Sequence, residues 1–372
     1  TEFTLNTTLP EGFEEPSISN MVVKFTNVNT GRVTNNTTFE NNQIHVTLPE
    51  GMYHISMEGF IQYKREGESH EGLIRGYEES VNISGTTASL ATELFISQTS
   101  SDFIIAEIFF TGTVTEEGQQ YDGDKYIKIY NNTDKVLYAD GLSIVGSAFQ
   151  TVDKQDYTPN IMKDYFSVSA VFMIPGTGKD VPVQPGEDLL IAVCGINHKE
   201  YNSRSFDLSK ADFEFFDWDA ADVYPDTDGP APNLDKWYSS SLTVTGFHNR
   251  GSETYAIARM QGTKEDFLTN NKYTATYIWT FEDYTMERTL DTYKVPNAWI
   301  VDAVNCSPTS MFEWLVIDSS IDAGWTWCAE NNSDKNRYNT AVVRKTGSNG
   351  KLQDTNNSTQ DFIPHTTPSM LQ

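Results

Sequence analysis

Short runs of alternating apolar and polar residues, separated by turn residues, constrain the fold of this chain more than any other feature. Three such runs, Ile104–Phe110, Asp124–Asn131 and Asp140–Ile144, follow one another with Gly, Asn and Asp residues between them. A period of two places successive side chains on opposite faces of a strand, so each run predicts a β-strand. Strand-favouring Tyr, Phe and Trp number 18, 21 and 7, and no long stretch has the helical period. The sequence therefore predicts a mostly all-β fold.

The length of the chain favours two domains. At 372 residues, it exceeds the roughly 100 residues of one ordinary β-sandwich. Residues 1–92 contain short strand patterns separated by turns, and the polar segment Ser97–Ser101 is typical of a linker. We therefore expect one β-sandwich domain over residues 1–99 and a second, larger β-sandwich over residues 100–372.

The first of these domains contains a sharp turn signal. Residues Leu48–Tyr53 read Leu-Pro-Glu-Gly-Met-Tyr, which predicts a strand, a turn with Pro at its first corner, and a returning strand paired as a hairpin. The segment resembles the hairpin of transthyretin-like and prealbumin-like sandwiches, which also resemble carboxypeptidase-regulatory domains. That resemblance implies a spacer domain of a bacterial surface protein.

Several segments of the second domain, in order along the chain, resemble the lamin-tail-type immunoglobulin-like family. A plain domain of that family needs roughly 100 residues, so long insertions are expected near 147–168, 197–240 and 262–298. The resemblance implies a module that displays or binds and carries no catalytic constellation. The whole chain resembles uncharacterised cell-surface lipoproteins of Bacteroidetes, a family without an established activity. The matching segments are 104–110, 124–131, 140–144, 183–192, the expected hairpin 242–257, 301–304, 339–345 and 354–368.

The charge balance disfavours nucleic acid as a partner. Lys and Arg number 26 against 52 Asp and Glu, which gives a net charge of −26, and basic residues do not cluster beyond pairs such as Lys64-Arg65. No apolar stretch approaches the roughly 20 residues of a transmembrane segment. The chain begins at Thr1 without an initiator Met, so we expect that a targeting segment carrying a lipid anchor was removed. The expected location is extracytoplasmic, anchored at the outer membrane.

Familiar catalytic and zinc motifs do not occur in this sequence. The six His residues form no zinc-binding pattern, and no Cys-x-x-Cys or Gly-x-Ser-x-Gly is present. Cys194, Cys306 and Cys328 are expected to be buried thiols, with a Cys306–Cys328 disulfide as the alternative. A pair of carboxylates for glycoside hydrolysis could come from the 52 acids, so a hydrolase stays open as the weaker alternative.

An aromatic and acidic segment is the main candidate for ligand binding. Flat rings stack on the apolar faces of sugars, and neighbouring carboxylates accept hydrogen bonds from hydroxyls. Packing in the core and binding of a partner protein are the competing explanations. A second aromatic group, Trp314, Trp325 and Trp327, is expected in the core, with Trp325 and Trp327 on one face of a strand. The candidate ligand-binding residues are Phe213, Phe215, Trp218, Tyr224, Trp237 and Tyr238.

The same segment is rich in aspartates. It is not an EF-hand, because Pro230, Pro232 and Trp237 occupy positions that an EF-hand reserves for ligands or flexible backbone. A solvated acidic loop is the first explanation of this crowding. A Ca²⁺ site in the loop is the alternative, and no other cofactor is predicted. The candidate calcium ligands are Asp217, Asp219, Asp226 and Asp228.

Taken together, these features predict a non-enzymatic binding or scaffolding protein at the bacterial cell surface. By analogy with the family, it would be accessory to outer-membrane uptake, with an outer-membrane protein or a surface glycan as partner. The alternatives are a carbohydrate-binding module that uses residues 213–238 and, more weakly, a glycan or ester hydrolase.

Overall fold

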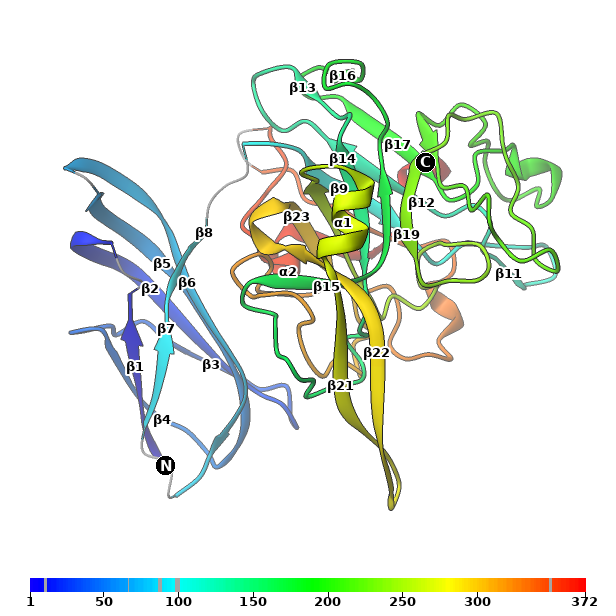
Figure 1. Cartoon of the computed structure of the whole chain (residues 1–372). Helices are drawn as coiled ribbons and strands as arrows, with labels where there is room; N and C mark the ends of the chain where they lie inside the picture. Colours follow the sequence, from blue (N-terminus) through cyan, green and yellow to red (C-terminus); the bar gives the residue numbers. More distant parts are fainter. Residues whose placement is uncertain (10–11, 66, 86–88, 98–100, 348–349) are drawn as a thin grey trace. The chain divides into compact units, whose positions relative to one another are not determined.

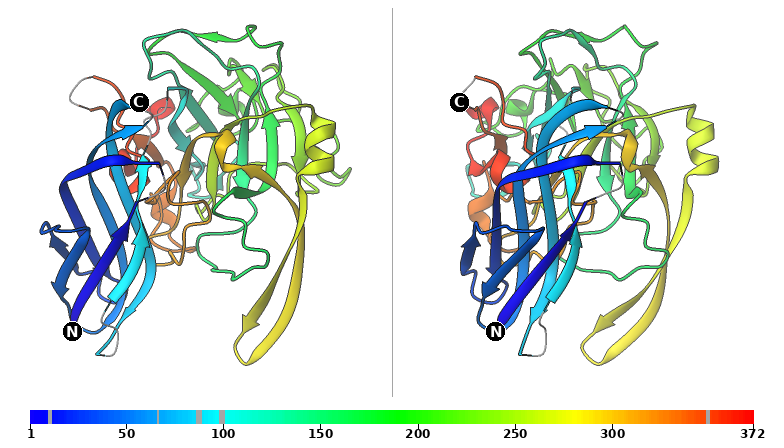
Figure 2. Two further views of the ribbon diagram at one scale, coloured as in Figure 1. Left: turned by 60° about the vertical axis from the view of Figure 1, so that its left-hand side comes forward. Right: turned by 90° about the vertical axis from the view of Figure 1, so that its left-hand side faces the viewer.

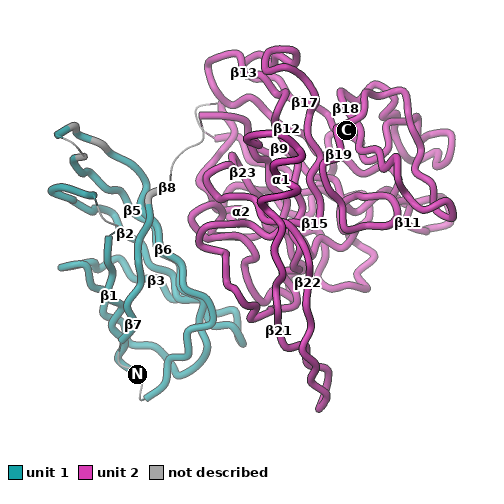
Figure 3. The backbone as a smooth tube through the Cα atoms, in the orientation of Figure 1, with its two compact units in different colours: residues 1–99 teal, residues 100–372 magenta. Residues whose placement is uncertain are grey.

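The computed structural model describes residues 1–9, 12–65, 67–85, 89–97, 101–347 and 350–372. The chain divides into two compact units, Thr1–Thr99 (unit 1) and Ser100–Gln372 (unit 2), which Figure 3 shows in different colours. Strands make up 46% of the chain and helices only 6%, which confirms the prediction of an all-β fold. Figure 1 shows these strands arranged in several sheets.

Unit 1 is built from two sheets around one core. Apolar residues at alternate positions of the strands, such as Phe3, Leu5, Phe25 and Ile55, are buried between them. The three-stranded sheet has the order β4 (Gln43–Thr47), β1 (Glu2–Thr8) and β7 (Ser89–Glu93). The five-stranded sheet has the order β3 (Val33–Asn36), β2 (Glu14–Asn27), β5 (Gly51–Arg65), β6 (Glu68–Ile83) and β8 (Phe95–Ser97).

The turn at Pro49 corrects one prediction. Strand β4 pairs with β1, whereas β5 pairs with β2 and β6, so the two strands flanking the turn belong to different sheets and form no hairpin. Leu48 on one side of the turn and Tyr53 on the other are both buried in the core of unit 1. Pro and Gly fix only the local direction of the chain, and burial of both flanks in one core decides which strands pair.

Unit 2 contains two large sheets. The six-stranded sheet has the order β18 (Phe213–Glu214), β17 (Asp188–Ala192), β12 (Tyr126–Tyr130), β9 (Ile104–Phe109), β24 (Ala341–Arg344) and β25 (Phe362–Thr366). The seven-stranded sheet has the order β21 (Lys272–Phe281), β22 (Tyr284–Pro296), β15 (Tyr165–Met173), β14 (Leu142–Ser147), β20 (Thr254–Arg259) and β23 (Ile300–Asn305), and β19 (Asp235–Ser239) also pairs with β15.

The remaining elements of unit 2 are short. Two small ladders pair β10 (Thr113–Val114) with β11 (Gln120–Tyr121) and β13 (Leu137–Tyr138) with β16 (Pro182–Val183). In the part of the chain that the structure describes, no helix has the length and apolar character needed to cross a membrane. The helices are η1 (His198–Glu200), α1 (Lys264–Asn270), η2 (Asn297–Trp299), η3 (Lys335–Arg337), α2 (Ser358–Asp361) and η4 (Ser369–Leu371).

The central strands β14, β15 and β20 of the seven-stranded sheet are covered on both faces, which explains why they have few polar positions. In β14, Ile144 is buried in the main core of unit 2, while the next residue, Val145, joins a second core. Loop residues such as Phe149, Tyr157 and Trp314 complete that second core. A strand that is buried on both faces has few positions for polar side chains.

Two further expectations about unit 2 are wrong. Residues 240–253 are a loop, and only Thr254–Arg259 forms a strand, which pairs with β14 and β23, so the expected hairpin over 242–257 does not form. Trp325 and Trp327 lie outside any strand and are half-exposed. Thr326 and Cys328 take the core-facing positions of this segment, so the two Trp rings lie on its other side and stack on Phe312 (4.7 Å between centroids) and His365 (5.7 Å).

Trp314 and two of the three cysteines are buried, as expected. The Trp314 ring is in the second core, and its indole Nε1 donates a hydrogen bond to the Gln150 carbonyl (2.8 Å). Cys306 and Cys328 are buried and Cys194 is half-buried, and all three thiols are free, so the alternative of a Cys306–Cys328 disulfide is not realised.

Candidate functional site

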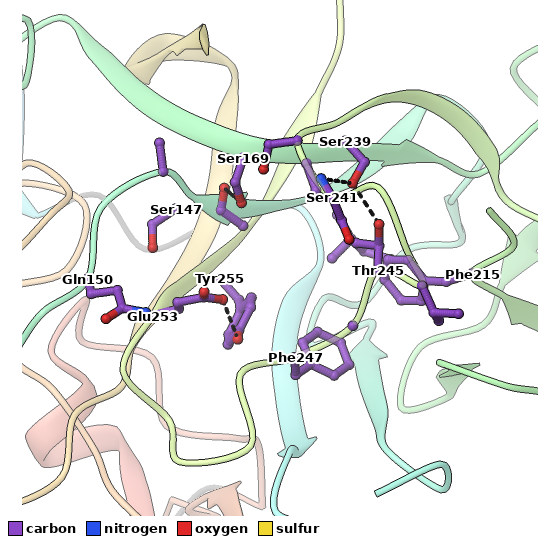
Figure 4. Close-up of a pocket in the computed structure, with 17 residues that line it drawn as sticks. Ser147, Gln150, Ser169, Phe215, Ser239, Ser241, Thr245, Phe247, Glu253 and Tyr255 are labelled. Atoms are coloured by element: carbon purple, nitrogen blue, oxygen red, sulfur yellow. Dashed lines mark hydrogen bonds between the residues drawn. The ribbon is translucent and has the colours of Figure 1, made fainter. Parts of the chain in front are cut away.

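A cavity of about 320 Å³ opens at one end of the main core of unit 2. Figure 4 shows its lining, which combines hydroxyl groups on one side with aromatic rings below them. The hydroxyl-bearing residues are Ser147, Ser169, Ser239, Ser240, Ser241 and Thr245. The rings are Phe215, Phe247 and Tyr255, and Gln150 and Glu253 add an amide and a carboxylate.

An irregularity in the sheet creates this cavity. Strand β15 pairs with β22 over 165–168 and with β19 over 170–173, so its partner changes at Ser169. At the same level the register of β14 against β15 shifts between Gly146 and Ser147. The Ser240 N–H donates to the Ser169 carbonyl (2.8 Å), which holds the start of the loop 240–253 against this gap. Bulges of this kind bend a strand and occur beside binding sites.

The aromatic floor is rigidly packed. Phe247 meets Phe215 edge to face (5.7 Å between centroids, 85°) and Tyr255 in the same way (4.9 Å, 88°). Phe215 also packs on Phe172 from β15 (4.9 Å). Edge-to-face contacts add to the apolar burial of such rings, so the floor presents a fixed apolar surface.

Glu253 and Tyr255 form the polar end of the floor. The Tyr255 hydroxyl donates to Glu253 Oε2 (2.9 Å) and accepts the backbone N–H of His248 (2.7 Å). Burial raises the pKa of the Glu253 carboxyl to about 7, although the hydrogen bond from Tyr255 and the charge of Lys125 oppose the shift. Burial likewise raises the pKa of Tyr255 well above its usual range. Near neutral pH, Glu253 can therefore act as a donor or as an acceptor.

The hydroxyl wall is held by a buried aspartate. The hydroxyls of Ser239 and Thr245 are hydrogen-bonded (2.7 Å), and the Ser241 N–H donates to Ser239 Oγ (3.1 Å). Thr245 donates its N–H and its hydroxyl to Asp217 (2.6 and 3.0 Å). Asp217 in turn accepts from the Lys236 ammonium (2.6 Å). The loop that carries Ser240, Ser241 and Thr245 is thus fixed to β19.

The six aromatic residues singled out from the sequence do not form one platform. Phe213, Phe215 and Trp237 are buried, and Tyr238 is half-buried against Tyr293 (4.4 Å between centroids). Strand positions in or next to β18 and β19 direct these rings toward the cores, and of these Phe215 lines the cavity.

Trp218 and Tyr224 are the exposed members of that set. Their exposed fractions are 69% and 66%, and they lie on the loop 217–224. The Ala221 N–H donates to the Leu242 carbonyl (2.9 Å), which joins this loop to the loop that lines the cavity. Of the six aromatic residues predicted to bind a ligand, Trp218 and Tyr224 are therefore accessible, on a surface next to the cavity.

The structure does not bring the four candidate calcium ligands together. Asp217 and Asp219 both pair with Lys236, whose ammonium takes the place that the hypothesis gave to a metal ion. Asp226 accepts the backbone N–H of Asp217 (2.8 Å), and Asp228 accepts from the Asn233 side chain (2.9 Å). Across the described residues, no group of three or more His, Cys, Asp or Glu side chains converges as a metal site.

Several cavity residues have only weak signals in the sequence. Three consecutive serines, 239–241, at the end of a strand are an unusual composition that could have marked the wall. Glu253 immediately precedes β20 and Tyr255 is the second residue of that strand, but nothing local distinguishes them from their neighbours. Of the described residues that line the cavity, Glu253 alone carries a carboxylate, and none is His or Cys. The lining therefore offers hydrogen-bond partners above an apolar floor, and one titratable acid.

Comparison with known proteins places the chain beside a family without an assigned role. The profile of a family described as "Protein of unknown function (DUF4876)" matches residues 184–369, half of the chain. The crystal structure of a DUF4876 family protein from Bacteroides thetaiotaomicron is similar in fold, with a TM-score of 0.57 and 22% sequence identity. That similarity covers 99% of this chain and 96% of the other chain. Among curated proteins, no match was found.

Proposed function

Since the chain belongs to the DUF4876 family, whose description gives no function, we propose a function from the cavity itself: it binds a small, neutral, polyhydroxylated ligand such as a sugar. The observation that carries this proposal is the wall of six Ser and Thr hydroxyls above three aromatic rings. A sugar presents hydroxyl groups around its rim and C–H groups on its faces. Hydroxyls that both donate and accept suit the rim, and rings suit the faces.

Size and charge narrow the class of ligand. A volume of about 320 Å³ lies at the lower end of the range for ligand pockets, which fits one or two sugar units and not a long chain. An anionic ligand would meet Glu253 and a protein with a net charge of −26. A neutral sugar avoids electrostatic repulsion from both.

We propose binding without chemistry. Glycoside hydrolysis needs two carboxylates on opposite sides of the scissile bond, and the described lining supplies Glu253 alone. The wider proposal is a binding or scaffolding protein at the bacterial cell surface, accessory to outer-membrane uptake, with an outer-membrane protein or surface glycan as partner. A lipid anchor, a prealbumin-like unit 1 and a lamin-tail-like unit 2 belong to the same proposal. It is supported by the sequence resemblances and by the Bacteroides relative of similar fold.

Calorimetric titration of the full chain with a panel of neutral mono- and disaccharides tests the cavity. We expect millimolar to micromolar binding of at least one sugar. Ser240→Trp should abolish it, because Ser240 lines the cavity, is exposed, and can take a large side chain that blocks the mouth. Thr280→Trp, at an exposed position that does not line the cavity, is the matched control and should bind as the unmodified chain does. Equal binding by both variants, or binding of no sugar in the panel, would contradict the proposal.

The exposed rings favour a second candidate, binding of a longer surface glycan by stacking on Trp218 and Tyr224. Trp218→Ala should then lower retention of the protein on immobilised polysaccharides, while the affinity of a monosaccharide for the cavity stays unchanged. Unaltered retention would remove this candidate and leave the cavity proposal intact.

A further inference from the structure

Strands β21 and β22 form a long antiparallel ribbon that leaves the body of unit 2. Their pairing runs from Lys272 opposite Tyr293 to Phe281 opposite Tyr284. The base of the ribbon is held at Thr276, which exchanges backbone hydrogen bonds with Thr158, and by the pairing of residues 293–296 with β15. Figures 1 and 2 show the distal part projecting from the rest of unit 2, and residues 280–289 are all exposed.

One face of the distal ribbon, here called the aromatic face, has an unusual composition. Side chains at alternate positions of β21, and their partners across the ribbon, share this face. All six belong to the residue types that are enriched at protein interfaces. The opposite face has one large apolar residue, Ile278, among threonines and Glu287. The aromatic face consists of Tyr277, Trp279, Phe281, Tyr284, Met286 and Arg288.

Ring contacts hold the aromatic face, whose distal part is solvent-exposed, while Tyr277 at its base is half-buried and packs edge to face on Phe149 (6.1 Å between centroids). The rings of Trp279 and Phe281 are parallel within 4°, with centroids 5.9 Å apart. The Arg288 guanidinium lies over the Trp279 ring, 4.7 Å from its centroid. Phe281 and Tyr284 are each 60% exposed. A two-stranded ribbon alone in water is marginally stable, so an exposed apolar face on it gains from being covered.

The charges along the ribbon indicate what covers it. The tip carries two acids, Glu282 and Asp283, and the aromatic face carries one cation, Arg288, nearer the base. A membrane surface is a poor match, because the acids would enter it first and the chain has a net charge of −26. This order of charges is self-complementary: in two antiparallel copies, each cation meets the acids of the other copy.

We propose that the aromatic face is a self-association surface, which packs face to face and antiparallel against the same face of a second copy of this chain. Arg288 of each copy lies beside Glu282 and Asp283 of the other. The interface is isologous, so it closes as a dimer. Six side chains per copy make a surface smaller than the about 800 Å² per partner of a stable complex, so the dimer is weak and reversible.

Sedimentation analysis of the full chain tests this directly. At about 0.15 M salt, where long-range repulsion is screened, we expect a concentration-dependent dimer on the order of 10 μM to 1 mM protein. The double variant Trp279→Ser with Phe281→Ser should stay monomeric over this range. Ile278→Ser is the matched control, since it removes an exposed apolar side chain from the opposite face and should dimerise as before. A monomer at all concentrations, or a dimer that the double variant retains, would overturn the proposal.

A charge exchange tests the antiparallel arrangement separately. Arg288→Glu alone, and Glu282→Lys with Asp283→Lys, should each weaken the dimer at least tenfold through like-charge contacts. An equimolar mixture of these two variants should restore association, because every charged contact in the mixed dimer is again between opposite signs. These side chains are exposed, so near-UV circular dichroism should show an unchanged fold. If the mixture associates no better than each variant alone, the proposed arrangement is wrong.

Discussion

At the scale of single residues, several buried polar side chains of the kinds that catalyse reactions are instead fully hydrogen-bonded within the fold. His198 is buried, and its Nε2 lies 2.8 Å from the Cys194 carbonyl, which can only accept. Its Nδ1 accepts from the Tyr121 hydroxyl (2.7 Å), so both ring nitrogens are used in the neutral form. Burial lowers the pKa of His198, which favours that neutral form. Glu214 is held in the same way, by the backbone N–H groups of Gly195 (2.6 Å) and Gly229 (2.7 Å).

Glu253 differs from these residues because its proton is available near neutral pH. Its pKa is raised from 4.5 to about 7 by burial, so the folded state keeps the proton over a range in which the unfolded state releases it. The stability linked to this proton is fully present below about pH 4.5 and is lost as pH rises to about 7.

We therefore expect the free energy of unfolding of the unmodified chain to fall by up to about 3 kcal/mol between pH 4.5 and 7.5, relative to Glu253→Gln. Urea unfolding of both proteins at several pH values measures the difference between their free energies of unfolding. The titration of His248 and of other groups is common to both proteins and cancels in that difference. A difference independent of pH would contradict the assignment of this proton to Glu253.

At the scale of elements, a buried charge network ties together strands that are distant in sequence. Arg344 on β24 donates to the Ile105 carbonyl on β9 (2.7 Å) and to Asp302 on β23 (2.6 Å). Asp354 and Asp361, from the C-terminal segment, lie 3.4 and 3.6 Å from the same guanidinium. The guanidinium also donates to the Gln353 carbonyl (3.0 Å), so acids and two carbonyls compensate the cost of burying its charge. The guanidinium of Arg344 thus joins β9, β23 and the C-terminal segment, which are far apart in the sequence.

The distal part of the β21–β22 ribbon is exposed, in contrast to its base. Replacing residues 278–287 by Asn-Gly would close the ribbon between Tyr277 and Arg288, which are directly opposite each other, with a two-residue turn of the favoured kind. We expect the thermal midpoint of the shortened chain to stay within about 2 °C of the original, because all the removed residues except the half-exposed Trp279 are exposed. A fall well beyond this would show that the distal ribbon packs on the rest of the protein.

At the scale of the whole molecule, each unit has its own core. Among the described residues, one apolar cluster lies in unit 1, around Phe3, Phe25 and Ile55, and the other clusters are built from residues of unit 2. Each unit also completes its own sheets. We therefore expect the two units to fold independently.

Scanning calorimetry of the full chain should therefore resolve two transitions, the smaller with an enthalpy of about 60–80 kcal/mol, as for a domain of about 100 residues. The separate fragments 1–99 and 100–372 should melt within a few degrees of the corresponding transitions. A fragment that fails to fold, or whose midpoint moves far, would show that the units stabilise each other.

Much of the strand content could be predicted from local pattern. Alternation identifies β9, β12, β14, β17 and β24, since a strand with a buried face needs apolar residues at every second position. Pairing partners could not be predicted, as the turn at Pro49 shows: the same Pro and Gly can close a hairpin or carry the chain between sheets. The cavity could not be predicted either, because it depends on where β15 exchanges β22 for β19, which leaves no mark at Ser169.

The sequence by itself determined that this protein is built of short strands with a strongly acidic surface, because the strand period and the net charge depend only on residue order and composition. The tertiary structure decided which aromatic residues are buried, as with Phe213 and Trp237, and which are free, as with Trp218 and those of the ribbon. It also decided that Asp217 pairs with Lys236, which lies 19 residues further along the chain. Burial and charge pairing are set by residues far apart in sequence, and the fold alone brings those residues together.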